Sequence, residues 1–431
     1  MIFYWLGNRR FILTMTRFRL RCVLALACTL TVHAQQVTFT PFHKSGIYEL
    51  GERAGWAAQG AGTYSYVIRT NNREVIQSGT LNLASGSPTI ETTVNEPAML
   101  YVEVLPASTP GTPLHLGAAI APWKLQPLVP RPADFDSFWD SRLKDLSQIP
   151  INAVLTPTPT IKPGVEFYTV QLDSIGSHVQ GYLAKPSKEG KFPALVVFQY
   201  AGVYALHPET VTDRAAEGWL ALDVDSHDLP PNQAAGVSSN YQAIGNTSRE
   251  TSYFLNMYLR DSRAIDYISS RPDWDGKTIV ALGTSMGGQQ SLVTAALNPR
   301  ITAVIVNEPS GADSNGDLHG RKSGYPNWPS ENPMVMQTAL YFDTVNFAPR
   351  IQVPVLAAIG FIDTTCPPAG IWTALNQISG PSEVIPMIES DHNHITPEKQ
   401  EAWNSRSKQI LDQILNGGKF QPDQSLTHKN N

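Results

Sequence analysis

The sequence predicts an α/β protein: a doubly wound, mostly parallel sheet, preceded by a small all-β sandwich of the immunoglobulin-like type. Short alternating apolar and polar runs, broken by turn residues, fill the chain from 36 to about 122. A proline-rich stretch follows, and beyond residue 135 apolar runs alternate with amphipathic ones. Closely spaced strands without helical periodicity are typical of a sandwich, whereas alternating strands and helices are typical of a parallel sheet covered on both faces.

The first 34 residues have the layout of a secretory signal peptide. Three arginines precede the apolar run 22–32, and small residues lie at the first and third positions before a cleavage point after Ala34. The run is about half as long as the roughly 20 apolar residues that a membrane span needs. The 14 residues before Met15 lie outside a normal signal-peptide layout, so we expect translation to start at Met15. We also expect the mature protein to be secreted or periplasmic, without a membrane anchor.

The charge of the mature chain argues against nucleic acid as a partner. Removing 1–34 takes away five arginines and no acidic residue, which leaves 27 basic against 37 acidic residues. The resulting excess of acidic residues lacks the basic footprint that binds nucleic acid or anionic lipid. Of the three cysteines only Cys366 remains, so we expect no intrachain disulfide.

Composition divides the mature chain into three parts. Residues 35–121 form the predicted sandwich, which we expect to serve as a packing or spacer module, with carbohydrate binding as the alternative. Residues 122–415 form the second domain, which opens with four prolines between 122 and 132 that favour extended backbone. Residues 416–431 are a polar tail that we expect to fray.

The second domain is predicted element by element from its apolar periodicity. The first helix covers 135–146, where aromatic and leucine side chains fall on one face. The runs that follow predict strands at 194–200, 219–225, 278–283, 301–307, 353–360 and 382–388, and helices at 252–270, 287–297, 368–378 and 397–415.

The stretch "ALGTSMGGQQ" holds the candidate nucleophile, Ser285. Gly283 and Gly287 flank it at minus two and plus two, between a predicted strand and a predicted helix. A glycine-rich connection is the alternative, but a G-x-S-x-G pattern in this context is typical of the sharp turn that exposes a serine in α/β-hydrolases. This context predicts an α/β-hydrolase fold.

A nucleophilic serine needs a base and an acid that orients the base, and in this fold they follow in the order acid, then histidine. Asp363 lies just beyond the strand 353–360, and His392 and His394 lie just beyond the next strand. Asp363 could instead cap the following helix, with Glu308 as the rival acid. We favour His392 as the base because it is nearer the strand end, which leaves His394 as a possible substrate contact.

The oxyanion needs two preorganised donors. We expect one from the backbone N–H of Met286, directly after the nucleophile. The second is expected from Tyr200 or Ala201, in the loop after the strand 194–200. Tyr200 could otherwise be a buried ring.

Four stretches resemble the acetyl xylan esterase and cephalosporin C deacetylase family of α/β-hydrolases: "PADFDSFWDSRL", "GTSMGGQQ", "YFDTVNFAPRI" and "FIDTTCPPAGIWTALN". The resemblance covers roughly 130–410. It implies Ser285, Asp363 and His392 as the catalytic residues, with the backbone amides of Met286 and Tyr200 as oxyanion donors. Members of this family often form closed hexameric rings, so a homo-oligomer is possible here.

The chain departs from the family pattern at several positions. Met286 stands where glutamine is usual, and the segment 226–228 reads Ser-His-Asp where Arg-Gly-Gln is usual. Asp391 replaces the glycine commonly found before the histidine, and Asn393 replaces the acidic residue commonly found after it. The additional sandwich is a further departure.

These features predict a secreted serine esterase that removes acetyl or similarly short acyl groups from sugars or polysaccharides such as xylan, without a cofactor or metal. A serine peptidase of the prolyl oligopeptidase type and a catalytically inactive glycan-binding protein are the alternatives. Glu308 and Trp328 are further candidate substrate contacts, and Trp328 could equally belong to the core of a cap formed by 311–340.

Overall fold

The computed structural model describes residues 37–86, 88–107, 111–160 and 162–427. The predicted signal peptide lies outside the described residues. Both the N-terminal strand-rich region and the following α/β region belong to a single compact unit, Val37–Asn431.

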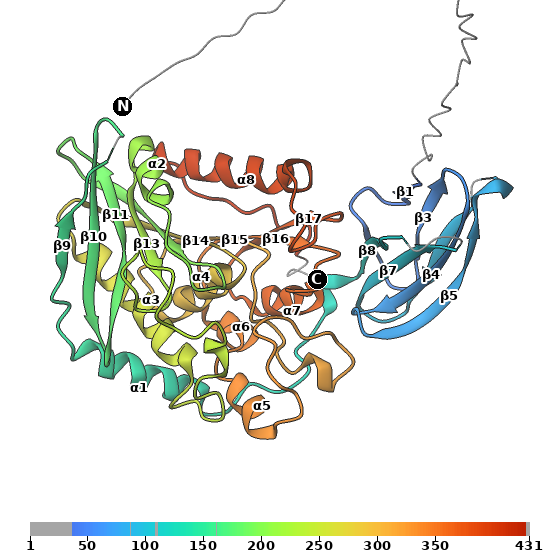
Figure 1. The fold of residues 1–431 in the computed structure, drawn as a ribbon, viewed down its shortest axis with the longest axis horizontal. Helices are drawn as coiled ribbons and strands as arrows, with labels where there is room; N and C mark the ends of the chain where they lie inside the picture. Colours follow the sequence, from blue (N-terminus) through green and yellow to red (C-terminus); the bar gives the residue numbers. More distant parts are fainter. Residues whose placement is uncertain (1–36, 87, 108–110, 161, 428–431) are drawn as a thin grey trace, which may run out of the picture. The chain divides into compact units, whose positions relative to one another are not determined.

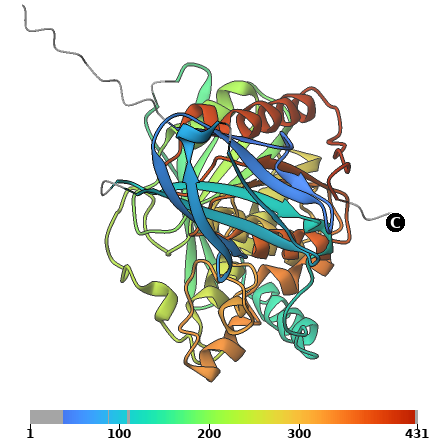
Figure 2. The same ribbon diagram turned by 90° about the vertical axis from the view of Figure 1, so that its right-hand side faces the viewer.

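The N-terminal region forms two sheets, whose strands are drawn in blue to teal in Figure 2. One sheet has the order β1-β3-β6 and the other the order β2-β8-β7-β4-β5. Side chains from both sheets share a hydrophobic core. The strands are β1 Thr38–Pro41, β2 Ile47–Tyr48, β3 Arg53–Gln59, β4 Thr63–Thr70, β5 Glu74–Asn82, β6 Thr89–Thr93, β7 Ala98–Pro106 and β8 Leu114–Ile120.

The α/β region is built on a large mixed sheet with the order β17-β16-β15-β14-β12-β13-β11-β10-β9 (Figure 1). From β12 to β17 each neighbouring pair is parallel, whereas β9, β10 and β11 pair antiparallel at one side. The strands are β9 Val154–Pro157, β10 Val165–Ser174, β11 Ser177–Pro186, β12 Phe192–Phe198, β13 Leu220–Asp225, β14 Trp274–Thr284, β15 Ala303–Asn307, β16 Val355–Gly360 and β17 Ser382–Met387.

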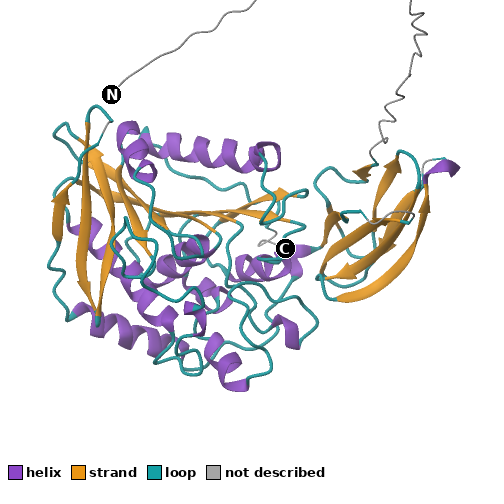
Figure 3. Cartoon of the chain, in the orientation of Figure 1, coloured by secondary structure: helices purple, strands orange, loops and turns teal. Residues whose placement is uncertain are grey.

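Helices cover both faces of this sheet, as the purple ribbons above and below the orange strands show in Figure 3. The α-helices are α1 Phe135–Ser147, α2 Glu209–Glu217, α3 Tyr253–Ser270, α4 Met286–Leu297, α5 Pro333–Ala339, α6 Thr344–Phe347, α7 Pro368–Gln377 and α8 Pro397–Leu415. Short 3-10 helices lie at η1 Leu83–Ser85, η2 Pro122–Lys124, η3 Tyr241–Ala243, η4 Gly316–Leu318 and η5 Ala348–Arg350.

Each face of the sheet has its own hydrophobic core. One core contains apolar side chains of α2 and α8 together with those of the central strands. The larger core, on the other face, contains side chains of α1, α3, α4 and α7. This two-layer covering explains why the central strands are mostly apolar, with β13, β15 and β16 buried at every position, including Asp223 and Asp225 of β13.

The architecture confirms the predicted α/β-hydrolase-like fold with a large, mostly parallel sheet, and the predicted helices and strands are present. The antiparallel strands β9 to β11 and helix α2 were not predicted. The N-terminal region has two sheets around one core, and its classification as immunoglobulin-like stays a prediction.

The polar tail differs from the expectation that it frays. Phe420 is buried, and the backbone N–H of Asp423 donates to the Glu383 carboxylate at 2.9 Å. The hydroxyl of Thr427 donates to the backbone carbonyl of Ser382, also at 2.9 Å. The tail is therefore held along β17 as far as Thr427.

Within the described ranges, no helix combines the length and apolar character that crossing a membrane would need.

Candidate active site

Ser285 occupies a strained turn between β14 and α4. Its φ of 56° and ψ of −122° lie outside the usual regions for a residue with a Cβ. A Cβ added to Gly283 would lie 2.2 Å from the carbonyl carbon of Gly287, and one added to Gly287 would lie 2.1 Å from the carbonyl oxygen of Phe198. Only glycine fits at these two flanking positions, which is the physical reason for the spacing seen in the sequence.

The structure brings Ser285, His392 and Asp363 together in one hydrogen-bonded chain. The His392 Nε2 lies 2.8 Å from the Ser285 hydroxyl oxygen, and the His392 Nδ1 lies 2.8 Å from Asp363 Oδ2. Asp363 is fixed from behind, because its Oδ1 accepts hydrogen bonds from the backbone N–H groups of Thr365 and Cys366, both at 2.8 Å. The imidazole ring is therefore oriented by a buried, anchored carboxylate.

Electrostatics prepare His392 to hold a proton. Burial alone would lower the pKa of His392, but the hydrogen bond and charge of Asp363, with smaller effects of Glu308 and Asp391, outweigh burial and raise this pKa above its ordinary value. A base with this character accepts a proton from a serine hydroxyl more readily than an isolated buried imidazole does.

His394, the second candidate base, points elsewhere. Its side chain is 83% exposed, and its Nδ1 lies 3.2 Å from Asp391. The geometry therefore selects His392 as the partner of Ser285. His394 stays exposed to solvent, two residues beyond His392 in the same loop.

Glu308 does not fit either of the roles predicted for it. It is fully buried, and its Oε1 accepts a hydrogen bond from the Ser390 hydroxyl at 2.9 Å. Burial, reinforced by the negative charge of Asp363, raises the pKa of Glu308 to about 7. Because Asp363 holds the His392 ring and the Glu308 carboxylate has no exposed surface, Glu308 is neither the orienting acid nor a direct substrate contact.

The predicted oxyanion donors lie at two different loops. Met286 is the first residue of α4, so its N–H points out of the first turn, where a helix stabilises negative charge. The backbone N–H of Tyr200 donates to the Tyr204 hydroxyl at 3.2 Å. The Tyr200 ring is 50% exposed and stacks on the Tyr204 ring at 4.5 Å, so the alternative prediction of a buried Tyr200 ring is wrong.

The loop that carries Tyr200 is held by buried polar contacts that the sequence did not indicate. The Gln199 side chain donates to the carbonyl of Tyr204 at 2.9 Å, while the Gln290 side chain donates to the carbonyl of Gln199 at 2.8 Å. His227 places its Nε2 2.9 Å from the carbonyl oxygen of Gly202. Burial lowers the pKa of His227 to about 4, so the ring is neutral near pH 7 and its Nε2–H donates.

Tyrosine hydroxyls surround the side chain of Met286. The hydroxyls of Tyr241 and Tyr325 lie 2.6 Å apart, at 3.3 Å and 3.2 Å from the Met286 sulfur.

Trp328, a predicted substrate contact, is 7% exposed and packs against Phe254 at 5.6 Å between ring centroids. It is therefore part of the hydrophobic core, which was the other role considered for it.

Cys366 lies beside His392 and Asp363. Its sulfur is 4.0 Å from His392 Nε2, and burial raises the pKa of this thiol. Among the described residues, Asp363, Cys366 and His392 are a group whose possible metal-ligand atoms lie within 4.8 Å of one another. The His392 nitrogens already contact Asp363 and Ser285, so an ion at this position would displace the chain of hydrogen bonds.

Comparisons with known proteins agree with this geometry. The model of the acetyl xylan esterase (AXE1) family matches residues 123–315 and 325–408. The acetyl esterase Axe7A of Xylanibacter ruminicola is 31% identical over 378 residues, which cover 82% of this chain and 85% of that protein.

Solved structures show the same relationship. An acetyl xylan esterase from Paenibacillus sp. R4 matches with a TM-score of 0.59 and 27% identity, over 67% of this chain and 98% of that one. Acetyl xylan esterase 1 from Thermoanaerobacterium sp. JW/SL YS485 shares the fold, with a TM-score of 0.58 and 22% identity over 68% and 97% of the two chains. The chain therefore belongs to the acetyl xylan esterase family, and it is a carboxylic ester hydrolase of the serine α/β-hydrolase type.

Proposed function

We propose that this protein removes acetyl or similarly short acyl groups from carbohydrates through an acyl-enzyme on Ser285. The observation that carries the proposal is the chain of two 2.8 Å hydrogen bonds from Ser285 through His392 to Asp363. The strained turn at Ser285 adds support, because it presents the hydroxyl beside a helix N-terminus.

The first half of the reaction forms the acyl-enzyme. The Ser285 oxygen attacks the ester carbonyl carbon while His392 Nε2 takes the hydroxyl proton. The N–H groups of Met286 and Tyr200 donate to the resulting oxyanion, and a substrate oxygen replaces the Tyr204 hydroxyl as acceptor at Tyr200. His392 then gives its proton to the sugar oxygen as the carbon–oxygen bond breaks.

The second half releases the acid. Water attacks the acyl carbonyl, and His392 takes one proton from this water. Collapse of the second tetrahedral intermediate breaks the bond to Ser285, whose oxygen recovers the proton from His392. Throughout both halves Asp363 stays ionised and keeps Nδ1–H directed toward its carboxylate. The residues that we propose in direct roles are thus Ser285, His392 and the two backbone donors.

Family membership supports acetylated carbohydrate as the substrate class. The acetyl xylan esterases and the acetyl esterase named above suggest xylan or its oligosaccharides as the acyl carrier.

We further propose that the protein is exported, on the strength of the arginine-flanked apolar run in 1–34. Its two-sheet region is proposed to be an immunoglobulin-like sandwich, supported by the shared core of both sheets, and a homo-oligomer is proposed from the family resemblance.

The experiment that tests this function measures acid release from acetylated xylan and from 4-nitrophenyl acetate and octanoate. We expect release of acetate, strong preference for acetate over octanoate, and a loss of at least about 1000-fold in kcat for Ser285→Ala and for His392→Ala. The matched control His394→Ala should retain wild-type kcat, because its exposed ring lies apart from Ser285. Equal turnover of octanoate would contradict the short-acyl specificity, and full activity of Ser285→Ala would contradict the mechanism.

A further inference from the structure

Strand β7 of the N-terminal region is buried on both of its faces. Leu100, Val102 and Val104 point into the core shared by the two N-terminal sheets. Met99 and Tyr101, which alternate with them, are also buried, at 2% and 8% exposure. In β5, at the edge of the same sheet, most positions are exposed instead. Something outside the two sheets must therefore cover the outer face of β7.

The α/β region supplies that cover. Met99 of β7 and Ala119 of β8 belong to the same hydrophobic core as Phe361, which follows β16, and Trp372 of α7. At Gly117 of β8, an added Cβ would lie 2.6 Å from the Cβ of Phe361 and 2.8 Å from its backbone carbonyl atoms. The two regions therefore approach so closely that only glycine fits between the strand and Phe361.

A turn of the N-terminal region makes polar contacts with the α/β region. Asn71 adopts a positive φ of 50°, its side-chain oxygen accepts from the N–H of Met99 at 2.9 Å, and its backbone carbonyl accepts from the N–H of Lys322 at 3.0 Å. Arg73, at the end of this turn, forms an ion pair in which its Nη1 lies 3.2 Å from Asp317 Oδ1. These contacts fix the turn against the segment that leads to Tyr325.

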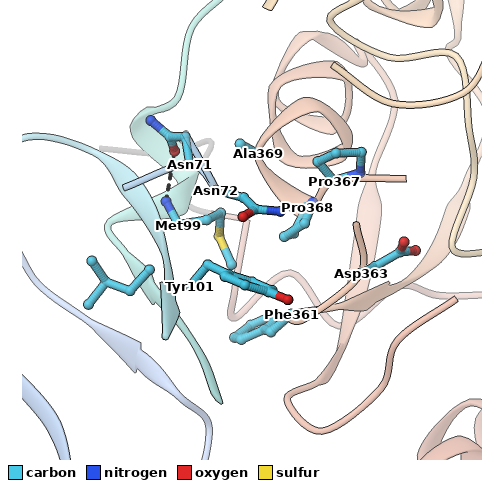
Figure 4. A pocket seen from close by; sticks show the side chains of 10 residues that line it. Asn71, Asn72, Met99, Tyr101, Phe361, Asp363, Pro367, Pro368 and Ala369 are labelled. Atoms are coloured by element: carbon cyan, nitrogen blue, oxygen red, sulfur yellow. Dashed lines mark hydrogen bonds between the residues drawn. The ribbon is translucent and has the colours of Figure 1, made fainter. Parts of the chain in front are cut away.

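A small cavity between the two regions shows which segment is held. Its volume is about 10 Å³, room for about one water molecule at most. Asn71, Asn72, Met99 and Tyr101 form one wall in Figure 4, and the segment 361–369 forms the other. Asp363 belongs to the second wall, with its carboxylate turned away from the cavity. The N-terminal region thus packs directly behind the residue that orients His392.

The loop that carries His392 also lies within electrostatic range of this face. The Tyr101 hydroxyl is 2.9 Å from His115 Nδ1. Burial, and then the charge of Glu103, raise the pKa of Tyr101 to about 12, and the charge of Asp391 adds to this rise. Asp391, whose charge acts on Tyr101, directly precedes His392 in the same loop.

We propose that the N-terminal two-sheet region is a positioning element of the active site: through Gly117, Met99 and the turn at Asn71 it holds the segment 361–369 so that Asp363 keeps its contact with His392. This inference rests on the proposed esterase mechanism. It assigns the region a role in the chemistry of every ester, including one too small to touch it, and so goes beyond a spacer or a glycan-binding module.

The test is Gly117→Val, assayed with 4-nitrophenyl acetate over a range of pH. The valine must push the strand and Phe361 apart, and displacements of this kind lower kcat by about tenfold or more while KM changes little. The charge of Asp363 raises the pKa of His392, so a looser contact should move the acid limb of kcat/KM to lower pH. A loss of folded protein alone would lower the rate without moving this limb.

Two further variants keep the outcome decisive. Met99→Ala removes an interface side chain without inserting one, and it should shift the acid limb in the same direction if Gly117→Val fails to fold. Val102→Ala, in the inner core of the same strand, should lower Tm but leave kcat and the pH profile unchanged. The inference is overturned if both interface variants match wild type, or if Val102→Ala changes the kinetics equally. An inactive wild type would instead refute the proposed function.

Discussion

Two buried carboxylates near His392 differ in their partners, and this difference decides their roles. Asp363 accepts hydrogen bonds from two backbone N–H groups and from His392, so its charge is compensated. Glu308 accepts from the Ser390 hydroxyl, while its other oxygen, Oε2, is buried with no hydrogen-bond partner among the described residues. A poorly solvated carboxylate binds a proton more tightly, which accounts for the pKa of Glu308 near 7.

This imbalance predicts a pH-dependent stability effect of Glu308→Gln. Because the folded-state pKa of Glu308, about 7, lies above its ordinary value of 4.5, the wild type loses stability as pH rises from 4.5 to 7. Glutamine carries no charge, so at pH 8 we expect the variant to exceed the wild type in free energy of unfolding by up to about 3 kcal/mol. Urea unfolding at pH 4.5 and pH 8 measures the difference.

A second variant checks the cause of that effect. The hydrogen bond from the Ser390 hydroxyl lowers the pKa of Glu308, so Ser390→Ala should raise this pKa further. The free energy of unfolding of Ser390→Ala should therefore keep falling with pH beyond the range in which that of the wild type falls. If Glu308→Gln changed the free energy of unfolding equally at both pH values, packing rather than charge would be the cause. The elevated pKa would then be wrong.

At the scale of single elements, the loop after β12 depends on contacts from distant parts of the chain. His227 donates to the carbonyl of Gly202 through Nε2, accepts from the Tyr253 hydroxyl at 3.0 Å through Nδ1, and packs on the Tyr241 ring at 4.5 Å. Tyr241 in turn accepts from the N–H of Gly202 at 3.3 Å. The loop that presents the Tyr200 N–H is thus held at one glycine from both sides.

We predict that His227→Phe lowers kcat for 4-nitrophenyl acetate by about tenfold, with KM nearly unchanged. The phenyl ring keeps the packing on Tyr241 but removes both hydrogen bonds, so the oxyanion donor at Tyr200 becomes less well placed. Removing such a donor entirely costs more, about 100- to 1000-fold.

Tyr253→Phe is the matched control, because it removes only the hydroxyl that donates to His227. It should produce a smaller decrease of kcat in the same direction. The effect of His227→Phe should be independent of pH above 5, since the ring, with a pKa of about 4, is already neutral there. A rise of KM with unchanged kcat would instead indicate a role in binding.

The elements also explain what the sequence could predict. Ser285, Asp363 and His392 follow the ends of parallel strands, which converge at one edge of a sheet, so chain order alone brings them close. The antiparallel strands β10 and β11 were not predicted, although the alternation of polar and apolar residues in them is itself a signal of half-buried strands. Hydrogen bonds such as that of His227 to Gly202 depend on tertiary contacts that no local pattern encodes.

At the scale of the whole molecule, the larger core of the α/β region extends into the N-terminal sheets. Ile47, Met99 and Ala119 of the N-terminal sheets pack with the aromatic side chains of the α/β region. Separation of the regions would expose this apolar surface to water and open the contact between Gly117 and Phe361. Domains joined only by small polar contacts behave independently, whereas a shared apolar core couples their unfolding.

The shared core predicts that heat unfolds both regions in a single cooperative transition. Differential scanning calorimetry of the full chain should give one peak, with a calorimetric enthalpy equal to the van't Hoff enthalpy. Val102→Ala, in the core between the N-terminal sheets, should move the whole peak to lower temperature, because destabilising one region destabilises the coupled unit. Two resolved peaks, of which only the lower responds to Val102→Ala, would show that the regions fold independently and that the shared core contributes little to their association.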